Sequence, residues 1–102
     1  MQFNKIYTKN FSKKTRKLGK IEFLIIHYTG MQSKRASIKK LLNNKIKKKV
    51  SCHYLIDRQG KLIQIVEDNK IAWHAGESKW NKYKNLNANS IGIELVNKGH
   101  DY

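Results

Sequence analysis

A short apolar strand that ends in a histidine constrains this chain more than any other feature. Residues 21–29 read Ile-Glu-Phe-Leu-Ile-Ile-His-Tyr-Thr, with four apolar residues in a row before His27. This run of branched and aromatic side chains predicts a strand that is buried on both faces. His27 comes just before Thr29 and Gly30, so we expect it at the rim of a sheet, where open α/β sheets bind ligands. For this residue alone, a core histidine bonded to the backbone is the alternative.

Further elements of a single small α/β domain follow along the chain. A helix is predicted after Ser37, a suitable N-cap, because Ile38, Leu41, Leu42 and Ile46 stand at helical spacing. Three more strands are predicted at 50–57, 61–66 and 90–96, and the turn at 58–60 joins two of them as a hairpin.

The first twenty residues are predicted to form a basic lead-in to a domain at 21–102. Residues 1–20 are polar and rich in lysine, which favours poor order, while Ile6, Tyr7 and Phe11 offer apolar points for docking. The segment lacks the apolar stretch and cleavage site of a secretory signal. No run of the chain is long enough for a transmembrane segment.

The net charge of +15, from 22 basic against 7 acidic residues, attracts anionic partners. By count, 19 of the basic residues are lysines and 3 are arginines, whereas specific phosphate and base recognition relies on the arginine fork. Lysine, asparagine and isoleucine share A/T-rich codons, so nucleotide bias explains the excess better than nucleic-acid binding. We expect no specific nucleic-acid partner, and the sequence indicates no oligomeric state.

The last predicted strand carries a carboxylate in its middle. Alternation places Ile91, Ile93 and Leu95 on one face, suited to a core, and Ser90, Gly92 and Glu94 on the other. Gly92 clears space beside Glu94, as a ligand groove requires. A desolvated Glu94 would have a raised pKa, which suits a general base. The alternative is a surface glutamate on a half-exposed strand.

The long segment at 71–89 is rich in aromatic, small and polar residues. Trp73 and His74 are followed by Trp80 and Tyr83, a composition typical of a sugar- or peptide-binding cleft. Alternatively, Trp73 caps the core. Cys52 is the single cysteine, so it forms no internal disulfide, and a buried cysteine is more often inert than nucleophilic.

Four segments in this order resemble the zinc-dependent N-acetylmuramoyl-L-alanine amidases of the amidase-2 group, whose fold peptidoglycan recognition proteins share. They are residues 23–29 (FLIIHYT), 50–57 (VSCHYLID), 72–76 (AWHAG) and 89–95 (NSIGIEL). The resemblance spans residues 21–97. It implies a mixed central β-sheet flanked by helices and cleavage of the amide between N-acetylmuramic acid and L-alanine of the stem peptide.

The resemblance also implies roles for single residues. His27 matches a ligand of Zn²⁺, and Glu94 matches the carboxylate that acts on the metal-bound water. Trp73 and His74 match the motif that lines the groove for peptidoglycan or a muropeptide, while no catalytic role carries over to Cys52. The substrate implies the cell envelope or secretion, with the cytoplasm as the alternative because no signal peptide is visible.

The match stops before the other zinc ligands of the family. His100 and Asp101 come too early to take those places, so we expect a C-terminally truncated domain whose zinc binding is weak or absent and which does not hydrolyse substrate alone. An apolar sheet face should be left uncovered. The alternatives are a non-catalytic peptidoglycan-binding module, a decayed gene fragment and, more remotely, a basic nucleic-acid-binding protein.

Overall fold

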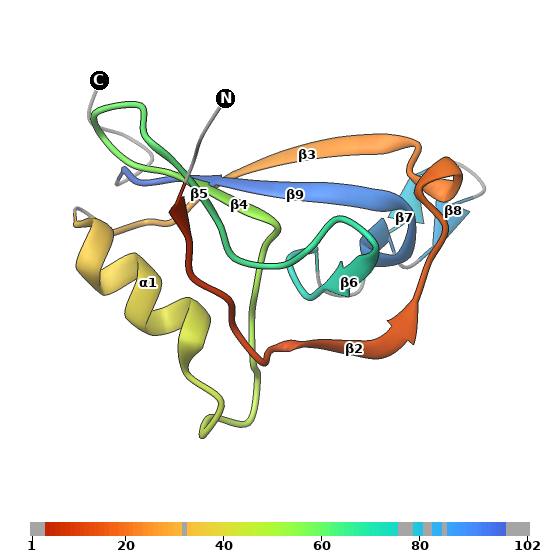
Figure 1. Cartoon of the computed structure of the whole chain (residues 1–102), viewed down its shortest axis with the longest axis horizontal. Helices are drawn as coiled ribbons and strands as arrows, with labels where there is room; N and C mark the ends of the chain where they lie inside the picture. The colour runs from red at the N-terminus through yellow and green to blue at the C-terminus, as the bar shows by residue number, and fades with distance from the viewer. Residues whose placement is uncertain (1–3, 32, 76–78, 81–82, 85, 98–102) are drawn as a thin grey trace.

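A five-stranded mixed sheet forms the centre of the computed structural model (Figure 1). The structure describes residues 4–31, 33–75, 79–80, 83–84 and 86–97. Across the sheet, the strands are β1 (Asn4–Lys5), β5 (Leu62–Gln64), β4 (Tyr54–Ile56), β9 (Ser90–Leu95) and β3 (Phe23–Tyr28). β4 and β5 pair antiparallel as the predicted hairpin, and the other neighbours pair in parallel. The predicted mixed α/β fold is therefore confirmed.

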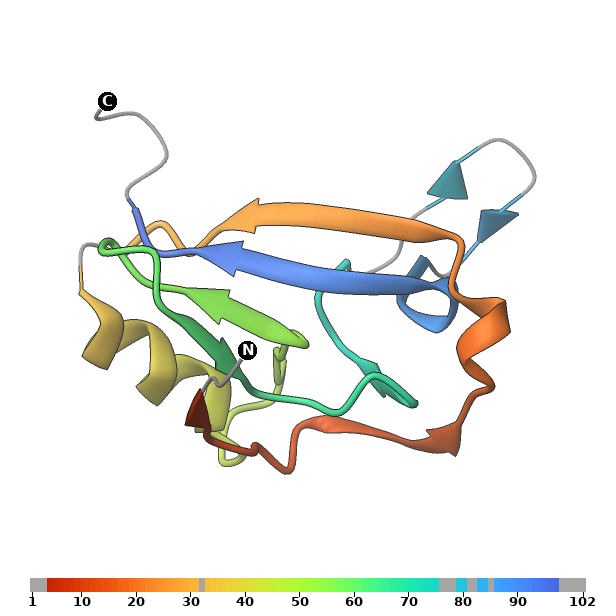
Figure 2. The ribbon, with the colours of Figure 1, turned by 45° about the horizontal axis from the view of Figure 1, so that its top comes forward.

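The remaining elements lie around this sheet. They are the helix α1 (Lys34–Leu42), the 3-10 turns η1 (Leu18–Lys20) and η2 (Leu86–Asn89), the ladder of β2 (Phe11–Thr15) with β6 (Lys70–Ala72), and the ladder of β7 (Lys79–Trp80) with β8 (Tyr83–Lys84). α1 and β2 both lie below the sheet in the view of Figure 1, and the upper face of the sheet, at β3, is turned away from them (Figures 1 and 2). Among the described residues, no helix has the length and apolar character needed to cross a membrane.

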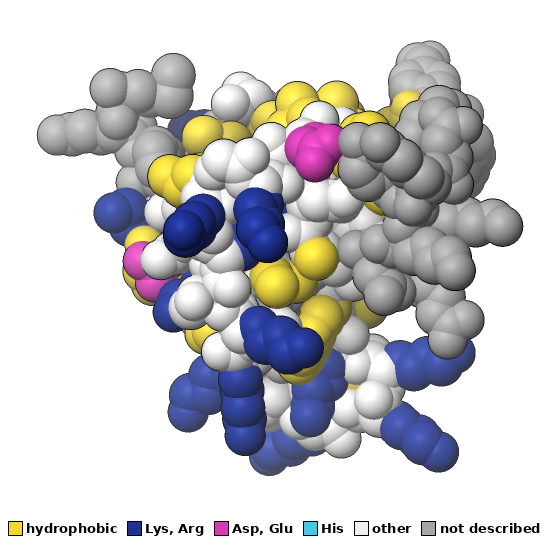
Figure 3. Space-filling model, turned by 90° about the vertical axis from the view of Figure 1, so that its right-hand side faces the viewer, with side chains coloured by type: hydrophobic (Ala, Val, Ile, Leu, Met, Phe, Trp, Pro, Cys, Tyr) yellow, Lys and Arg dark blue, Asp and Glu magenta, His cyan; other side chains and the backbone are white. Residues whose placement is uncertain are grey.

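Strand β3 is buried on one face, so the prediction of burial on both faces is wrong. Leu24, Ile26 and Tyr28 are 62%, 58% and 51% exposed, while Phe23 and Ile25 are half-buried. β3 is an edge strand, and α1 and β2 cover the other side of the sheet. Hydrophobic side chains accordingly lie along the top of the molecule in Figure 3. The expected uncovered apolar face is present within the described part of the chain.

The hydrophobic core lies on the side of the sheet that carries Glu94. Its buried members are Leu41, Cys52, Leu55, Ile63, Ile65, Val66, Ala72 and Val96. Leu55 stands opposite Glu94 in the register of β4 with β9, so the two side chains share a face. The prediction that Ile91, Ile93 and Leu95 face the core is wrong, because they share the face of β3 that is exposed.

The N-terminal segment is built into the fold, so the prediction of poor order is wrong for the described residues 4–20. β1 pairs with β5, and Ile6 and Phe11 pack against the core as predicted. Buried Thr8 and Asn10 donate hydrogen bonds of 2.7 and 3.0 Å to the carbonyl oxygen of Leu41. The segment thus satisfies a carbonyl group that the last turn of α1 leaves without a helical partner.

Helix α1 begins one turn earlier than predicted. Ser33, rather than Ser37, is the N-cap, and its Oγ accepts a 3.1 Å hydrogen bond from the Ala36 amide. Ser37 lies buried inside the helix and donates from Oγ to the Ser33 carbonyl oxygen at 2.9 Å. The helix ends at Leu42, which leaves Ile46 outside it and 39% exposed. Both serines satisfy the cap pattern, but the Ser33 hydroxyl oxygen accepts a helix amide, whereas the Ser37 hydroxyl donates to a carbonyl oxygen.

Buried Arg16 ties the N-terminal segment to two distant loops. Its Nε donates to the carbonyl oxygen of Asp68 at 3.1 Å, and its Nη1 donates to the carbonyl oxygens of Asn87 and Ala88, each at 3.1 Å. Three backbone carbonyls that would otherwise lack partners are satisfied by one guanidinium group. Arg16 therefore fixes the turn from which β9 begins.

Fully buried His53 links the sheet to β6. Its Nδ1 accepts a 3.1 Å hydrogen bond from the Gly92 amide, and its Nε2 lies 2.8 Å from the carbonyl oxygen of Lys70. Because the Gly92 amide donates to Nδ1, the hydrogen of a neutral ring is on Nε2, which faces the Lys70 carbonyl oxygen and also lies 3.0 Å from Arg16 Nη2. Burial and the neighbouring Arg16 guanidinium lower the pKa of His53, against a smaller opposing effect of the Lys70 carbonyl.

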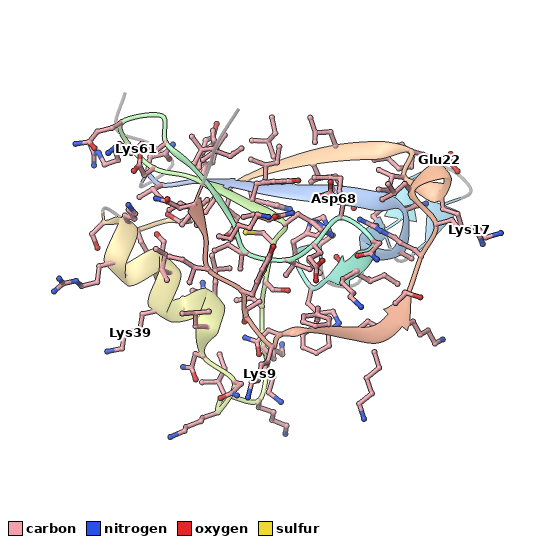
Figure 4. All side chains as sticks on the ribbon, in the orientation of Figure 1. Lys9, Lys17, Glu22, Lys39, Lys61 and Asp68 are labelled. Carbon is pink, nitrogen blue, oxygen red and sulfur yellow. The ribbon has the colours of Figure 1, made fainter. Side chains whose placement is uncertain are left out.

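The basic residues are spread around the outside of the molecule. Lys39 on α1, Lys61 after the β4–β5 turn and Lys9 lie at its periphery (Figure 4), and lysine and arginine side chains lie over the left side, centre and lower edge of the face seen in Figure 3. Lys34 forms an ion pair of 3.8 Å with Asp57. The dispersed pattern agrees with a compositional origin of the charge.

We expect His53 to destabilise the fold below about pH 6.5, the ordinary histidine pKa. Its pKa is lowered on folding, so the unfolded chain binds the proton first, and stability falls by up to about 1.4 kcal/mol per pH unit between the two pKa values. Urea unfolding at about pH 7.5 and about pH 5 measures the loss. His53→Gln, which does not titrate, should shrink the difference, and an undiminished difference would contradict the prediction.

Candidate active site

His27 and Glu94 lie opposite each other on the parallel strands β3 and β9. Both side chains are half-buried on the core-facing side of the sheet. Burial raises the pKa of the Glu94 carboxyl, and Lys40 acts in the opposite direction more weakly. The predicted rise in the pKa of Glu94 is thus confirmed. A carboxylate of this kind beside an imidazole is suited to accept a proton from a water molecule.

His74 lies between His27 and the start of β9. Its Nδ1 is 3.0 Å from His27 Nε2, and its Nε2 is 3.0 Å from Ser90 Oγ. The His27 and His74 rings meet edge to face, with centroids 5.3 Å apart. Burial, together with the nearby His27, His53 and Arg16, lowers the pKa of His74 to about 3. His74 is therefore neutral at ordinary pH.

Gly92 makes room for the His74 ring. A Cβ atom at position 92 would lie 2.4 Å from His74 Cγ, far inside van der Waals contact. Gly92 was predicted to clear space beside Glu94 for a ligand. The space is instead occupied by the His74 ring. Gly92 pairs with Ile25 and lies on the same face of the sheet as His27.

Trp73 and His74 line a pocket of about 780 Å³ beside this cluster. Its other lining residues are Lys47, Lys48, Lys49, Val50 and Asn87. The predicted groove motif therefore borders a real cavity, whose wall of exposed lysines is positively charged. The side chains of Trp80 and Tyr83 lie outside the described residues.

The backbone of the Trp73–His74 motif is anchored on both sides. Trp73 donates its amide to Ser51 Oγ and accepts the Ser51 amide at its carbonyl oxygen, both at 2.9 Å. Asn87 Oδ1 accepts the amides of His74 and Ala75 at 3.1 and 2.8 Å. Four hydrogen bonds thus fix the backbone of the motif, although it follows β6 as a loop.

Cys52 lies close to Glu94 but takes no part in the pocket. It is fully buried in the core, and its Sγ donates to the Tyr54 carbonyl oxygen at 3.3 Å. Burial and the Glu94 charge raise the pKa of the thiol well above its ordinary value. A protonated, enclosed thiol is a poor nucleophile, in agreement with the sequence analysis.

The described residues do not form a catalytic zinc site by themselves. Such a site needs three protein ligands, and the described part of the chain contains no group of three His, Cys, Asp or Glu residues that could hold a metal ion. His27 is the predicted ligand among them, while His100 and Asp101 lie outside the described residues.

The sequence does not predict the contacts that three residues make around the site: Arg16, His53 and Ser90. Ser90 was placed correctly on the face of Glu94, but nothing in its pattern indicates a contact with His74. Arg16 lies in the lysine-rich segment 1–20, for which the sequence predicts poor order. His53 looked like one more strand residue, and only the order of β4 and β9 in the sheet reveals its contact with Gly92.

Residues 17–102 match the Amidase_2 family, described as N-acetylmuramoyl-L-alanine amidase. The chain is 38% identical over 87 residues to the N-acetylmuramoyl-L-alanine amidase AmiD of Escherichia coli K12, covering 78% of this chain and 30% of AmiD. It is 49% identical over 47 residues to the 1,6-anhydro-N-acetylmuramyl-L-alanine amidase AmpD of the same strain, covering 46% of this chain and 26% of AmpD. The chain spans less than a third of the length of these two curated relatives.

Solved structures share the fold. A crystal structure of an AmpD selenomethionine derivative superimposes with a TM-score of 0.78 at 23% identity, covering 93% of this chain and 61% of AmpD. The complex of Escherichia coli AmiD with anhydro-N-acetylmuramic acid-L-Ala-D-gamma-Glu-L-Lys gives a TM-score of 0.67 at 35% identity, covering 89% of this chain and 35% of AmiD. With the family match over most of its length, the chain belongs to the N-acetylmuramoyl-L-alanine amidase (Amidase_2) family.

Proposed function

We propose that this chain provides the general base and the substrate groove of an N-acetylmuramoyl-L-alanine amidase. The observation that carries the proposal is the position of Glu94, which stands opposite His27 on the face of the sheet that also seats His74. The proposed substrate is a muropeptide with an anhydro-muramic acid end. This choice is supported by the name of AmpD and by the compound bound to AmiD.

In the proposed reaction, Glu94 accepts a proton from a water molecule while the water oxygen attacks the carbonyl carbon of the lactyl group. The carbon–nitrogen bond then breaks, and Glu94 returns the proton to the leaving amine of L-alanine. The raised pKa of Glu94 favours this return. Trp73 would pack against the ligand, and the lysines of the pocket wall would complement the carboxylates of the stem peptide.

Zinc is the proposed cofactor, with His27 as the proposed ligand among the described residues. A bound zinc ion supplies a Lewis acid and lowers the pKa of water. Because the described residues contain no group of three His, Cys, Asp or Glu residues that could hold a metal ion, we propose that zinc binding by this chain is weak and that its hydrolysis is slow. The proposed location is the cell envelope, with the cytoplasm as the alternative for recycled muropeptides.

A second candidate function is recognition of peptidoglycan without hydrolysis. It is favoured because described residues line a pocket beside Trp73, whereas they contain no group of three His, Cys, Asp or Glu residues that could hold a metal ion. Binding and hydrolysis are therefore measured separately. Muropeptide binding without release of stem peptide would favour this second candidate.

We expect Trp73→Ala to weaken muropeptide binding about five- to tenfold, because the loss of one aromatic contact costs about 1 kcal/mol. Calorimetric titration with a purified anhydro-muropeptide measures the affinity. Tyr28→Ala is the matched control, since Tyr28 is a half-exposed aromatic residue on the other face of the sheet. Equal affinity of the two variants would show that the ligand does not use this pocket.

Glu94→Gln should lower stem-peptide release by about 10²–10⁴-fold, the usual contribution of a general base. Its binding of muropeptide should remain within about twofold, since the amide keeps the shape of the side chain. Wild-type release should fall as the pH drops through the raised pKa of Glu94, because a protonated carboxyl cannot accept a proton. Chromatography of reaction products measures release, and exposed Glu22→Gln is the control. Undiminished hydrolysis by Glu94→Gln would rule out its role as the base.

Elemental analysis of the dialysed chain should find well below one zinc per molecule, because the described residues hold no group of three ligands for the metal. His27→Ala should remove most of what remains. One equivalent of zinc held at about micromolar affinity or tighter in the wild type would contradict the expectation.

A further inference from the structure

Four polar groups form a chain of contacts that leads to His27. Ser90 Oγ hydrogen-bonds to the carbonyl oxygen of Leu86 and also lies 3.0 Å from His74 Nε2. His74 Nδ1 in turn lies 3.0 Å from His27 Nε2. Ser90 is fully buried, so water does not compete for its hydroxyl group.

The chemistry of these groups gives the chain one direction. The Leu86 carbonyl oxygen only accepts, so the single hydrogen of the Ser90 hydroxyl points to it. Ser90 Oγ must then accept from His74, which places the hydrogen of the neutral His74 ring on Nε2. His74 Nδ1 is left as an acceptor, and His27 donates to it from Nε2.

We propose that Ser90 and His74 are positioning residues that hold His27 in the tautomer with its hydrogen on Nε2. The ring lone pair of His27 is then on Nδ1, so Nδ1 is the atom with which His27 would serve as a metal ligand in the proposed function. The inference rests on the proposed function only for the use made of His27, because the tautomer follows from the hydrogen bonds alone. It also gives His74 a role other than contact with substrate, which the sequence resemblance implied.

The neighbouring His53 shows the same device built from backbone groups. The Gly92 amide donates to His53 Nδ1, and the Lys70 carbonyl oxygen accepts from Nε2. His27 sits on the edge strand β3, where β9 is its neighbouring strand. At His27 the side chains of His74 and Ser90 set the tautomer, whereas at His53 the Gly92 amide sets it. The absence of a side chain at Gly92 leaves the space that the His74 ring occupies.

Nitrogen-15 NMR of the labelled chain in the presence of a chelator tests the proposal directly. Long-range proton–nitrogen correlations distinguish the protonated from the unprotonated ring nitrogen of each histidine. In the wild type at about pH 7.5, where these rings are neutral, we expect His27 and His74 to show the hydrogen on Nε2. Wild-type His27 with its hydrogen mainly on Nδ1 would overturn the proposal.

Ser90→Ala removes the acceptor for His74 and should raise the Nδ1-protonated share of both rings several-fold. Ser90→Thr, which keeps the hydroxyl, should restore the wild-type spectrum. Ser37→Ala is the matched control, because Ser37 is an equally buried serine that lies in α1 and donates to the Ser33 carbonyl oxygen instead. Unchanged His27 and His74 signals in a folded Ser90→Ala chain would overturn the proposal.

His74→Phe provides a second variant in case Ser90→Ala does not fold. It keeps a flat ring beneath Gly92 but removes the acceptor of His27, so His27 should lose its preference for Nε2. A preference retained in this variant would overturn the proposal. These measurements need no substrate. Failure of muropeptide binding with the expected tautomers would count against the proposed function alone.

Discussion

The parallel pairing of β3 with β9 is the constraint on which the rest of the site depends. It joins six residue pairs, from Phe23 with Ser90 to Tyr28 with Leu95, and backbone hydrogen bonds of 2.8 and 2.9 Å extend it at either end. A slip of one residue would turn His27 to the exposed face of the sheet. The register thus decides at once that His27 meets Glu94, that Gly92 lies beneath His74, and that Leu24 and Ile26 face outward.

Gly92 shows how closely fold and site are combined in β9. A glycine within a strand weakens it, since it costs backbone entropy and has no side chain to pack. Here its amide holds His53, and its missing side chain leaves the space for His74. One residue therefore places two imidazole rings whose centroids are 6.0 Å apart. The contacts of both rings compensate for what the strand loses at this position.

The sequence predicts the elements well and their environment less well. The hairpin of β4 with β5 and the strands β3 and β9 are visible because branched apolar residues cluster between turn residues. The buried face of β3 is not visible, because Leu24 and Ile26 are as apolar as Phe23 and Ile25. In the lysine-rich N-terminal segment, Thr8, Asn10 and Arg16 are ordered by contacts with residues far along the chain, which composition does not reveal. His27 and Glu94 were found by motif, whereas their pairing depends on the strand order.

In the proposed function, different residues of the pocket would attract the ligand and select it. Lys47, Lys48 and Lys49 are exposed at the wall of the pocket, so their charges are screened over about 8 Å at physiological salt and hold no fixed geometry. Trp73 and His74 are half-buried, and their backbone is held by Ser51 and Asn87. Fixed groups lose little entropy when a ligand binds, and they reject one of the wrong shape. In the proposed function, lysines of this kind would raise the local concentration of an anionic ligand, while its selection would depend on the anchored Trp73–His74 motif.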